Sequence, residues 1–298
     1  SIVLASASSC STEVVQENDG KRERWGEFFD AFDHDGDGTI TAQEAAQLSP
    51  HPDLIVGAKG DDLQLVLNTL FHVSSPVENV PYSVYQEFLE RTDDAGNKVE
   101  GKFASAVGLA IPYCLGDSYE GFRVVGTTPA LFEHVAYGLN PDGTPKNFRF
   151  ARGAAYKQDD FFSAVIGSKV AEQTGLKVGG RFRPTHGLHR DGHVHEEELQ
   201  VAGVLEATGT PSDRAVFVNI EGFYLMAGHA FDPSDDSEPE ALPPGEPLPE
   251  KYREVTAILV FVKPDNPAAA LYVTSYFNAS EKTQAVSPLR VLHQVQDE

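Results

Sequence analysis

The spacing of hydrophobic residues along the chain predicts helices near the N-terminus and mostly strands after it. Four aromatic residues early in the chain recur at positions i, i+3, i+4 and i+7, which is typical of one face of an amphipathic helix. They are Trp25, Phe28, Phe29 and Phe32. After a turn-rich break at 93–102, short apolar runs bounded by Gly, Pro and Asp predict strands. The expected strands are 53–59, 105–115, 120–128, 163–167, 199–207, 214–220 and 255–263, and the expected helices are 61–71, 81–91, 129–136, 168–174, 220–227 and 266–277.

Because helices and strands are interleaved through most of the chain, the predicted fold class is α+β, with a mixed sheet and helices packed on it. An acidic, proline-rich stretch at 232–250 interrupts this pattern and predicts a linker or long loop. The N-terminal third and the segment after 250 are expected to pack together. The strand-rich middle of the chain is then expected to form a separate lobe.

The net charge narrows the classes of partner. Among 298 residues, 45 are acidic and 23 are Lys or Arg, which gives a formal charge of −22. Such a charge disfavours nucleic acid and anionic membrane surfaces, and it suits a secreted or periplasmic protein or one that collects cations. Two cysteines, Cys10 and Cys114, provide no disulfide framework. Residues 1–9 are either the end of a transmembrane helix or signal sequence, or an ordinary first element; the sequence leaves both open.

Residues 33–44 match a calcium-binding EF-hand loop at every defining position. Carboxylates at alternate positions supply hard oxygen ligands, Gly38 permits the sharp turn, and a final glutamate closes the site with both oxygens. The expected ligands are Asp33, Asp35, Asp37, Thr39, Thr41 (near a bridging water) and Glu44. Since the chain has no second such loop, a structural Ca²⁺ site outside the cytoplasm is expected rather than a regulatory switch.

Four of the ten histidines lie in one short stretch and are candidate zinc ligands. They are His186, His189, His193 and His195. If the chain is extended there, His193 and His195 place both rings on one face, and neutral imidazoles with a nearby carboxylate suit Zn²⁺. His229 is a candidate remote ligand. The alternative interpretation, a solvated polar loop, stays open at this point.

From Asp53 onward the chain resembles the extracytoplasmic domain of FtsX-like (MacB-type) ABC-transporter permeases. The similar stretches follow the family's order, and they are 53–76, 80–88, 110–133, 164–187, 201–224 and 255–271. The histidine-rich stretch also resembles a loop found in a subgroup of these permeases associated with metal handling. The chain departs from the family in lacking the transmembrane helices and in carrying the EF-hand segment before the usual start.

The resemblance implies a two-lobed periplasmic module that binds a partner or cargo and couples to ATP-driven transport. The implied division is 1–51 (segment with the EF-hand), 52–127 with 251–298 (membrane-proximal lobe), 128–231 (distal lobe) and 232–250 (linker). The implied setting is the periplasmic face of the inner membrane. The implied partners are a separate ABC ATPase subunit, reached through the missing transmembrane helices, a periplasmic protein, and a second copy in the full-length permease.

No catalytic residue is predicted, because the chain has no nucleophile elbow, no Walker loop and no dinucleotide-binding motif. The alternative from another class is a secreted calcium- and zinc-binding protein, for which metallohydrolase activity is left open. Such activity needs an open coordination position and a general base, for which Glu196 and Glu197 are the local candidates.

Overall fold

The fold was analysed in a computed structural model, which describes residues 52–73, 78–92, 96–140, 142–187, 192–226, 229 and 246–296. The predicted calcium loop at 33–44, the histidine at position 189 and most of the linker at 232–250 lie outside these residues. The calcium site therefore stays a prediction.

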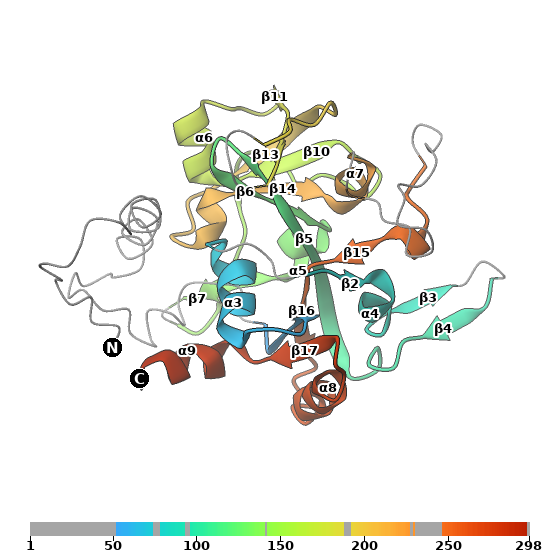
Figure 1. Cartoon of the computed structure of the whole chain (residues 1–298). Helices are drawn as coiled ribbons and strands as arrows, with labels where there is room; N and C mark the ends of the chain where they lie inside the picture. Colours follow the sequence, from blue (N-terminus) through green and yellow to red (C-terminus); the bar gives the residue numbers. More distant parts are fainter. Residues whose placement is uncertain are drawn as a thin grey trace, which may run out of the picture.

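The described chain is a mixture of strands and mostly short helices, which confirms the α+β class in its general form (Figure 1). The strands are β1 (Leu54–Ala58), β2 (Val80–Pro81), β3 (Glu90–Thr92), β4 (Lys98–Glu100), β5 (Val107–Tyr119), β6 (Phe122–Thr127), β7 (Ala136–Leu139), β8 (Pro145–Asn147), β9 (Phe150–Gly153), β10 (Ser163–Ile166), β11 (Arg181–Phe182), β12 (Thr185–His186), β13 (Leu199–Leu205), β14 (Ala215–Asn219), β15 (Glu254–Val255), β16 (Ala257–Val262) and β17 (Thr283–Val286). The α-helices are α3 (Asp62–Val66), α4 (Tyr82–Gln86), α5 (Ala130–His134), α6 (Ser168–Thr174), α7 (Ile220–Leu225), α8 (Ala269–Asn278) and α9 (Pro288–Gln296). A π-helix (Leu67–Phe71) continues α3, and two 3₁₀ turns span Pro211–Arg214 and Glu250–Tyr252.

One large mixed sheet organises the described residues. Its strands lie in the order β11-β13-β10-β14-β6-β5-β16-β1-β17, with β9 added beside β13 and β12 beside β5. The pairs β10–β13 and β6–β14 are parallel, and the other pairs in this sheet are antiparallel. The 13-residue β5 is the long central ribbon of Figure 1, and it joins β16 at one end to β6 and β12 at the other.

Both faces of the sheet are buried, because alternate residues of its strands enter two different apolar clusters. In β14, Val216 and Val218 belong to one cluster, whereas Ala215 and Phe217 belong to the other. The first cluster also contains apolar side chains of α4, α6, α7 and α8. Side chains of α3, α5 and α9 complete the second cluster. This burial explains why the strands were recognisable as continuous apolar runs.

The structure corrects one of the helices expected from the sequence. The helix expected at 81–91 ends at Gln86, and Glu90–Thr92 instead forms a hairpin with β4. Gly96, with φ +83°, lies in the turn-rich stretch before β4 and adopts a left-handed backbone that favours glycine. Cys114 is buried. Within the described part of the chain, no helix combines the length and apolar character needed to cross a membrane.

Candidate metal centre

An irregularity in β5 places a carboxylate in the interior. The register between β5 and β6 shifts between Leu115 and Ser118, so Gly116 and Asp117 form a β-bulge. Bulges interrupt the regular alternation of side chains and re-aim them, often beside functional sites. On the other edge of β5, His186 of β12 pairs directly with Asp117. Because residues opposite each other in an antiparallel pair share a face, the carboxylate and this imidazole lie together.

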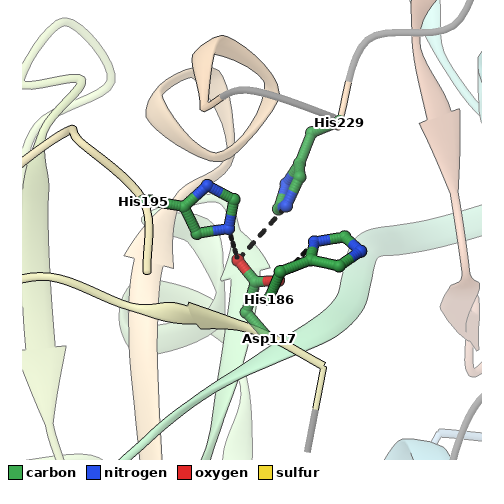
Figure 2. A group of neighbouring side chains, drawn as sticks. All are labelled: Asp117, His186, His195 and His229. Atoms are coloured by element: carbon green, nitrogen blue, oxygen red, sulfur yellow. Dashed lines mark ion pairs between the residues drawn. The ribbon is translucent and has the colours of Figure 1, made fainter. Parts of the chain in front are cut away.

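Two further histidines reach the same point from other segments. His195 returns alongside β12, where its backbone N–H donates to the carbonyl of Pro184 (3.0 Å). His229 follows α7, and its ring packs on Phe223 with the centroids 4.2 Å apart. Figure 2 shows the three imidazoles converging on the carboxylate of Asp117. One nitrogen or oxygen from each of the four residues lies within 4.8 Å of all the others.

The separations within this cluster suit a small metal ion. The Nε2 atoms of His195 and His229 lie 3.1 and 3.2 Å from Oδ2 of Asp117, and Nδ1 of His186 lies 3.4 Å from Oδ1. A tetrahedral ion with bonds of about 2.0 Å places its ligand atoms ~3.3 Å apart. The two contacts to Oδ2 therefore have about the spacing of ligand atoms around one ion, whereas His186 contacts the other oxygen, and the four ligand atoms lie within 4.8 Å of one another.

Three of the four side chains are buried, and their polar atoms make no hydrogen bond of suitable geometry with another described residue. The side chains of Asp117 and His195 are 0% exposed and that of His229 is 4% exposed. Neither carboxylate oxygen of Asp117 and neither ring nitrogen of His195 or His229 has a hydrogen-bond partner of suitable geometry among the described residues. Buried polar groups in this condition cost free energy unless something satisfies them. A metal ion bound to one atom of each of the four residues would give a partner to three of these buried atoms, one each on Asp117, His195 and His229.

The pKa values show a carboxylate that stays ionised in spite of its burial. Burial alone would raise the pKa of Asp117, but the adjacent His195 and His229 outweigh this effect and bring the pKa to about 2. In turn, contact with Asp117 raises the pKa of His195 against the effect of burial. An anionic oxygen among imidazoles is a donor set that suits borderline-soft divalent ions such as Zn²⁺.

The structure brings together two of the four histidines predicted from the sequence. His186 and His195 belong to the cluster. His193 is exposed and is not part of it, with its ring centroid 6.3 Å from that of His195. The histidine at position 189 lies outside the described residues. The remote candidate His229 does join the cluster.

The sequence analysis does not predict Asp117 as a ligand, because Gly116 and Asp117 follow the expected strand 105–115 and look like its boundary. An isolated glycine inside a strand pattern is, however, a signal of a bulge. That signal could have placed Asp117 within the strand, although not beside the histidines.

A cavity of about 120 Å³ adjoins the cluster. His186 and His229 line it, as do Cys114 and Tyr224 on its buried side and Asn79 at the surface. Gly116 also borders the cavity, and a Cβ added there would have no neighbour within 4 Å. The cluster is therefore next to a small space that leads toward solvent.

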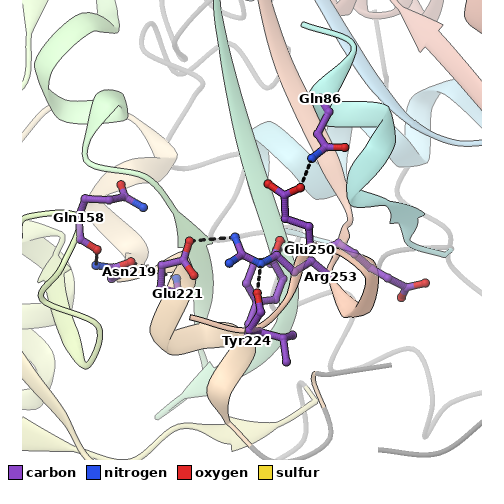
Figure 3. A network of polar contacts seen from close by, with 10 residues as sticks. Gln86, Gln158, Asn219, Glu221, Tyr224, Glu250 and Arg253 are labelled. Carbon is purple, nitrogen blue, oxygen red and sulfur yellow. Dashed lines mark hydrogen bonds and ion pairs between the residues drawn. The ribbon is translucent and has the colours of Figure 1, made fainter. Parts of the chain in front are cut away.

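A network of polar contacts links α7 to the segment that leads into β15 (Figure 3). Arg253 donates from Nη1 to Oε1 of Glu221 in α7 (3.0 Å) and from Nε to the carbonyl of Leu248. The hydroxyl of Tyr224 donates to the carbonyl of Glu254 (2.9 Å). Because Tyr224 belongs to α7 and Glu254 to β15, these contacts hold together the two segments that border the cavity.

A scan against models of protein families found no match for this chain, and a search of curated proteins also found none. The functional inference therefore rests on the chemistry of the cluster.

Proposed function

We propose that this chain is a non-catalytic metal-binding domain that holds one divalent transition-metal ion, of which Zn²⁺ is the best candidate. Asp117, His186, His195 and His229 are the proposed ligands. The observation that carries the proposal is the convergence of these four side chains, three of which are buried and have polar atoms without a hydrogen bond of suitable geometry among the described residues.

The donor set favours zinc over the harder cations. Three imidazole nitrogens and one carboxylate oxygen match the ligands that Zn²⁺ takes in proteins, whereas Ca²⁺ and Mg²⁺ prefer oxygen ligands throughout. Four protein donors complete a tetrahedral shell, which argues against a zinc-bound water for hydrolysis. The Nδ1 atoms of His195 and His229 have no hydrogen-bond partner among the described residues. Since such partners normally strengthen the binding of a metal by histidine, we expect a moderate affinity for zinc. A moderate affinity suits a site that later transfers its ion to another protein.

The wider setting that we propose is the periplasmic domain of an FtsX-like ABC-transporter permease, with the ion as its cargo or as a structural or regulatory ligand. The similar stretches from Asp53 onward and the charge of −22 support this setting. The calcium loop at 33–44 is not a feature of the family and supports only a location outside the cytoplasm. Co-purification of the full-length protein with an ABC ATPase subunit tests it. A parent gene that encodes neither transmembrane helices nor a neighbouring ATPase would instead favour a secreted metal-binding protein.

Zinc titration of the chelator-treated protein tests the metal centre. Excess calcium is included so that the acidic loop at 33–44 does not contribute to the heat. The wild type should bind one Zn²⁺, and His195→Ala and His229→Ala should each weaken binding by about a hundredfold, since even the loss of an outer-shell partner costs 10- to 100-fold.

His193→Ala is the matched control for these two variants. It removes an imidazole from the same stretch, but one that is exposed and outside the cluster, so it should bind zinc like the wild type. Binding that depends on His193 as strongly as on His195, or that survives loss of His229, would contradict the proposed centre.

A further inference from the structure

One of the four proposed ligands differs from the others in its exposure. The side chain of His186 is 54% exposed, whereas those of Asp117 and His195 are fully buried. The ring of His229 is buried as well and packs on Phe223. Of these four side chains, only that of His186 has room to turn away from the centre.

The backbone of His186 is held on both sides, so the ring can move without the strand. On one side, His186 pairs with Asp117 of β5. On the other side, its backbone N–H donates to the carbonyl of His193 (2.7 Å). The next residue, Gly187, accepts a hydrogen bond from the hydroxyl of Ser118 (2.7 Å). Side-chain rotation is a fast motion in exposed residues. A change of ligand at this position therefore requires no opening of the sheet.

The cavity lies where the ring of His186 would leave space. His186 and His229 border both the metal centre and the cavity. At the surface the cavity is bordered by Asn79, which is exposed, and by Glu254. The amide of Asn79 donates a hydrogen bond to the carboxylate of Glu254 (3.2 Å). A donor that enters from solvent can therefore approach the ion from the side of the ligand that can move.

The lining favours a cation or a neutral donor over an anion. Glu254 is its carboxylate, and a like charge would be repelled. The thiol of Cys114 and the hydroxyl of Tyr224 both donate to the carbonyl of Glu254 (3.4 and 2.9 Å), so they are already engaged. Neutral nitrogen donors, such as the imidazole of a histidine side chain, fit these surroundings and replace His186 without a change of charge.

We propose that the metal ion enters and leaves the centre through this cavity, by exchange of His186 for a neutral imidazole-type donor such as a histidine of a carrier protein. The route rests on the proposed metal-binding function. In the first step of release, the bond from the ion to His186 breaks and a bond to the incoming nitrogen forms, while the three buried ligands still hold the ion. The bonds to these three ligands then break in turn, as further donor atoms of the carrier bind the ion. In loading, the same steps run in reverse.

Filling the cavity separates this route from ordinary binding. Gly116→Val adds a side chain where a Cβ meets no atom within 4 Å, so it should narrow the cavity. Because Gly116 shares its β-bulge with Asp117, the equilibrium affinity for zinc is measured beside the rate, to show whether this ligand stays in place. Transfer of zinc from the loaded protein to free imidazole and a chelator should then slow by about tenfold, which corresponds to ~1.4 kcal/mol in the barrier. The equilibrium affinity for zinc should stay within about threefold of the wild type.

Two further variants serve as controls for the Gly116→Val experiment. Gly116→Ala fills less of the cavity and should slow the transfer less, which keeps the test valid if the valine variant does not fold. Gly108→Val changes an exposed glycine near the start of the same strand and should leave the rate of transfer unchanged.

Chemical rescue with Co²⁺ gives an independent readout. His186→Ala should bind Co²⁺ about 10- to 100-fold more weakly, and added imidazole should restore the absorption spectrum of four-coordinate Co²⁺. The His186→Ala/Gly116→Val double variant should not be rescued.

Unchanged transfer in both Gly116 variants, or equal rescue of the double variant, would overturn the route while leaving the metal centre intact. A wild-type protein that binds neither Zn²⁺ nor Co²⁺ would instead refute the proposed function, and the route with it.

Discussion

Variants of the ion pair between Glu221 and Arg253 should show whether stability depends on the charge of Glu221 or on its role as a hydrogen-bond acceptor. The pair links α7 to the residue before β15, with the two side chains 10% and 9% exposed and 3.0 Å apart. Removal of one partner from a buried pair typically costs about 3–5 kcal/mol, because the remaining charge is left unpaired. Glu221→Ala produces this situation for the guanidinium of Arg253.

The surroundings of Arg253 place the expected cost at the lower end of that range. Its Nε still donates to the carbonyl of Leu248, and its guanidinium lies over the rings of Tyr82 and Tyr224, with centroids at 5.3 and 5.5 Å. Cation–π contacts of this kind retain part of the stabilisation of the charge. Glu221→Ala should therefore lower the free energy of unfolding by about 3 kcal/mol.

Glu221→Gln should cost much less. Burial raises the pKa of Glu221, and the attraction of Arg253 reduces this rise without cancelling it. The ionised carboxylate is thus less favourable in the folded protein than in water, so its charge adds little net stability. Since the amide oxygen of glutamine still accepts from Nη1 of Arg253, we expect a cost of about 1 kcal/mol.

Urea unfolding at neutral pH, in the presence of a chelator so that zinc does not contribute, measures both variants. A Glu221→Leu/Arg253→Met double variant completes the comparison, and it should recover most of the loss because no unpaired charge is left. If the glutamine variant loses as much stability as the alanine variant, the charge itself is important and the interpretation of the raised pKa is wrong.

Three further predictions concern acid, calcium and catalysis. Burial and the nearby Arg123 lower the pKa of His72 from 6.5 to about 3. Between these two pH values only the unfolded chain binds a proton at this histidine, so acid favours unfolding. The free energy of unfolding should therefore fall by about 2 kcal/mol between pH 6.5 and about pH 5 because of His72. His72→Asn, which tolerates the left-handed backbone there (φ 60°), should lose less stability over that interval in zinc-free urea titrations, and an equal loss would contradict this. Calorimetry in millimolar calcium should show one site that Glu44→Gln impairs; absence of heat in the wild type would rule it out. Zinc-loaded protein should show no esterase or peptidase turnover, and turnover abolished by one substitution would refute the non-catalytic proposal.

The sheet could be predicted from the sequence because most of its strands are buried on both faces. Short runs rich in Val, Ile and Leu, such as 214–220 and 255–263, predict strands when Gly, Pro or Asp residues lie beside them. The order of the strands could not be derived in this way. The pairing of β5 with both β6 and β16 depends on contacts between segments that are distant in the chain, and local patterns carry no signal for such contacts.

The metal centre shows the same limit at the level of single residues. The density of histidines pointed to His186 and His195, because both lie in one short stretch that returns on itself. It also pointed to His193, on the assumption that an extended chain places alternate residues on one face. Around Val194 only an isolated bridge to Thr185 forms. The regular alternation on which that prediction depended is therefore absent from the described stretch.

The two predicted metal sites differ in how the chain specifies them, and this difference bears on what each can do. All the expected calcium ligands lie within residues 33–44, so this site can be recognised from a short stretch of sequence. The ligands of the proposed zinc centre come from β5, from the β12 stretch and from the end of α7, so that centre exists only when these segments are packed together. Binding there must therefore stabilise their arrangement, and any motion that separates α7 from β5 must weaken the hold on the ion. A site of this second kind is the one suited to couple the capture of an ion to a conformational change.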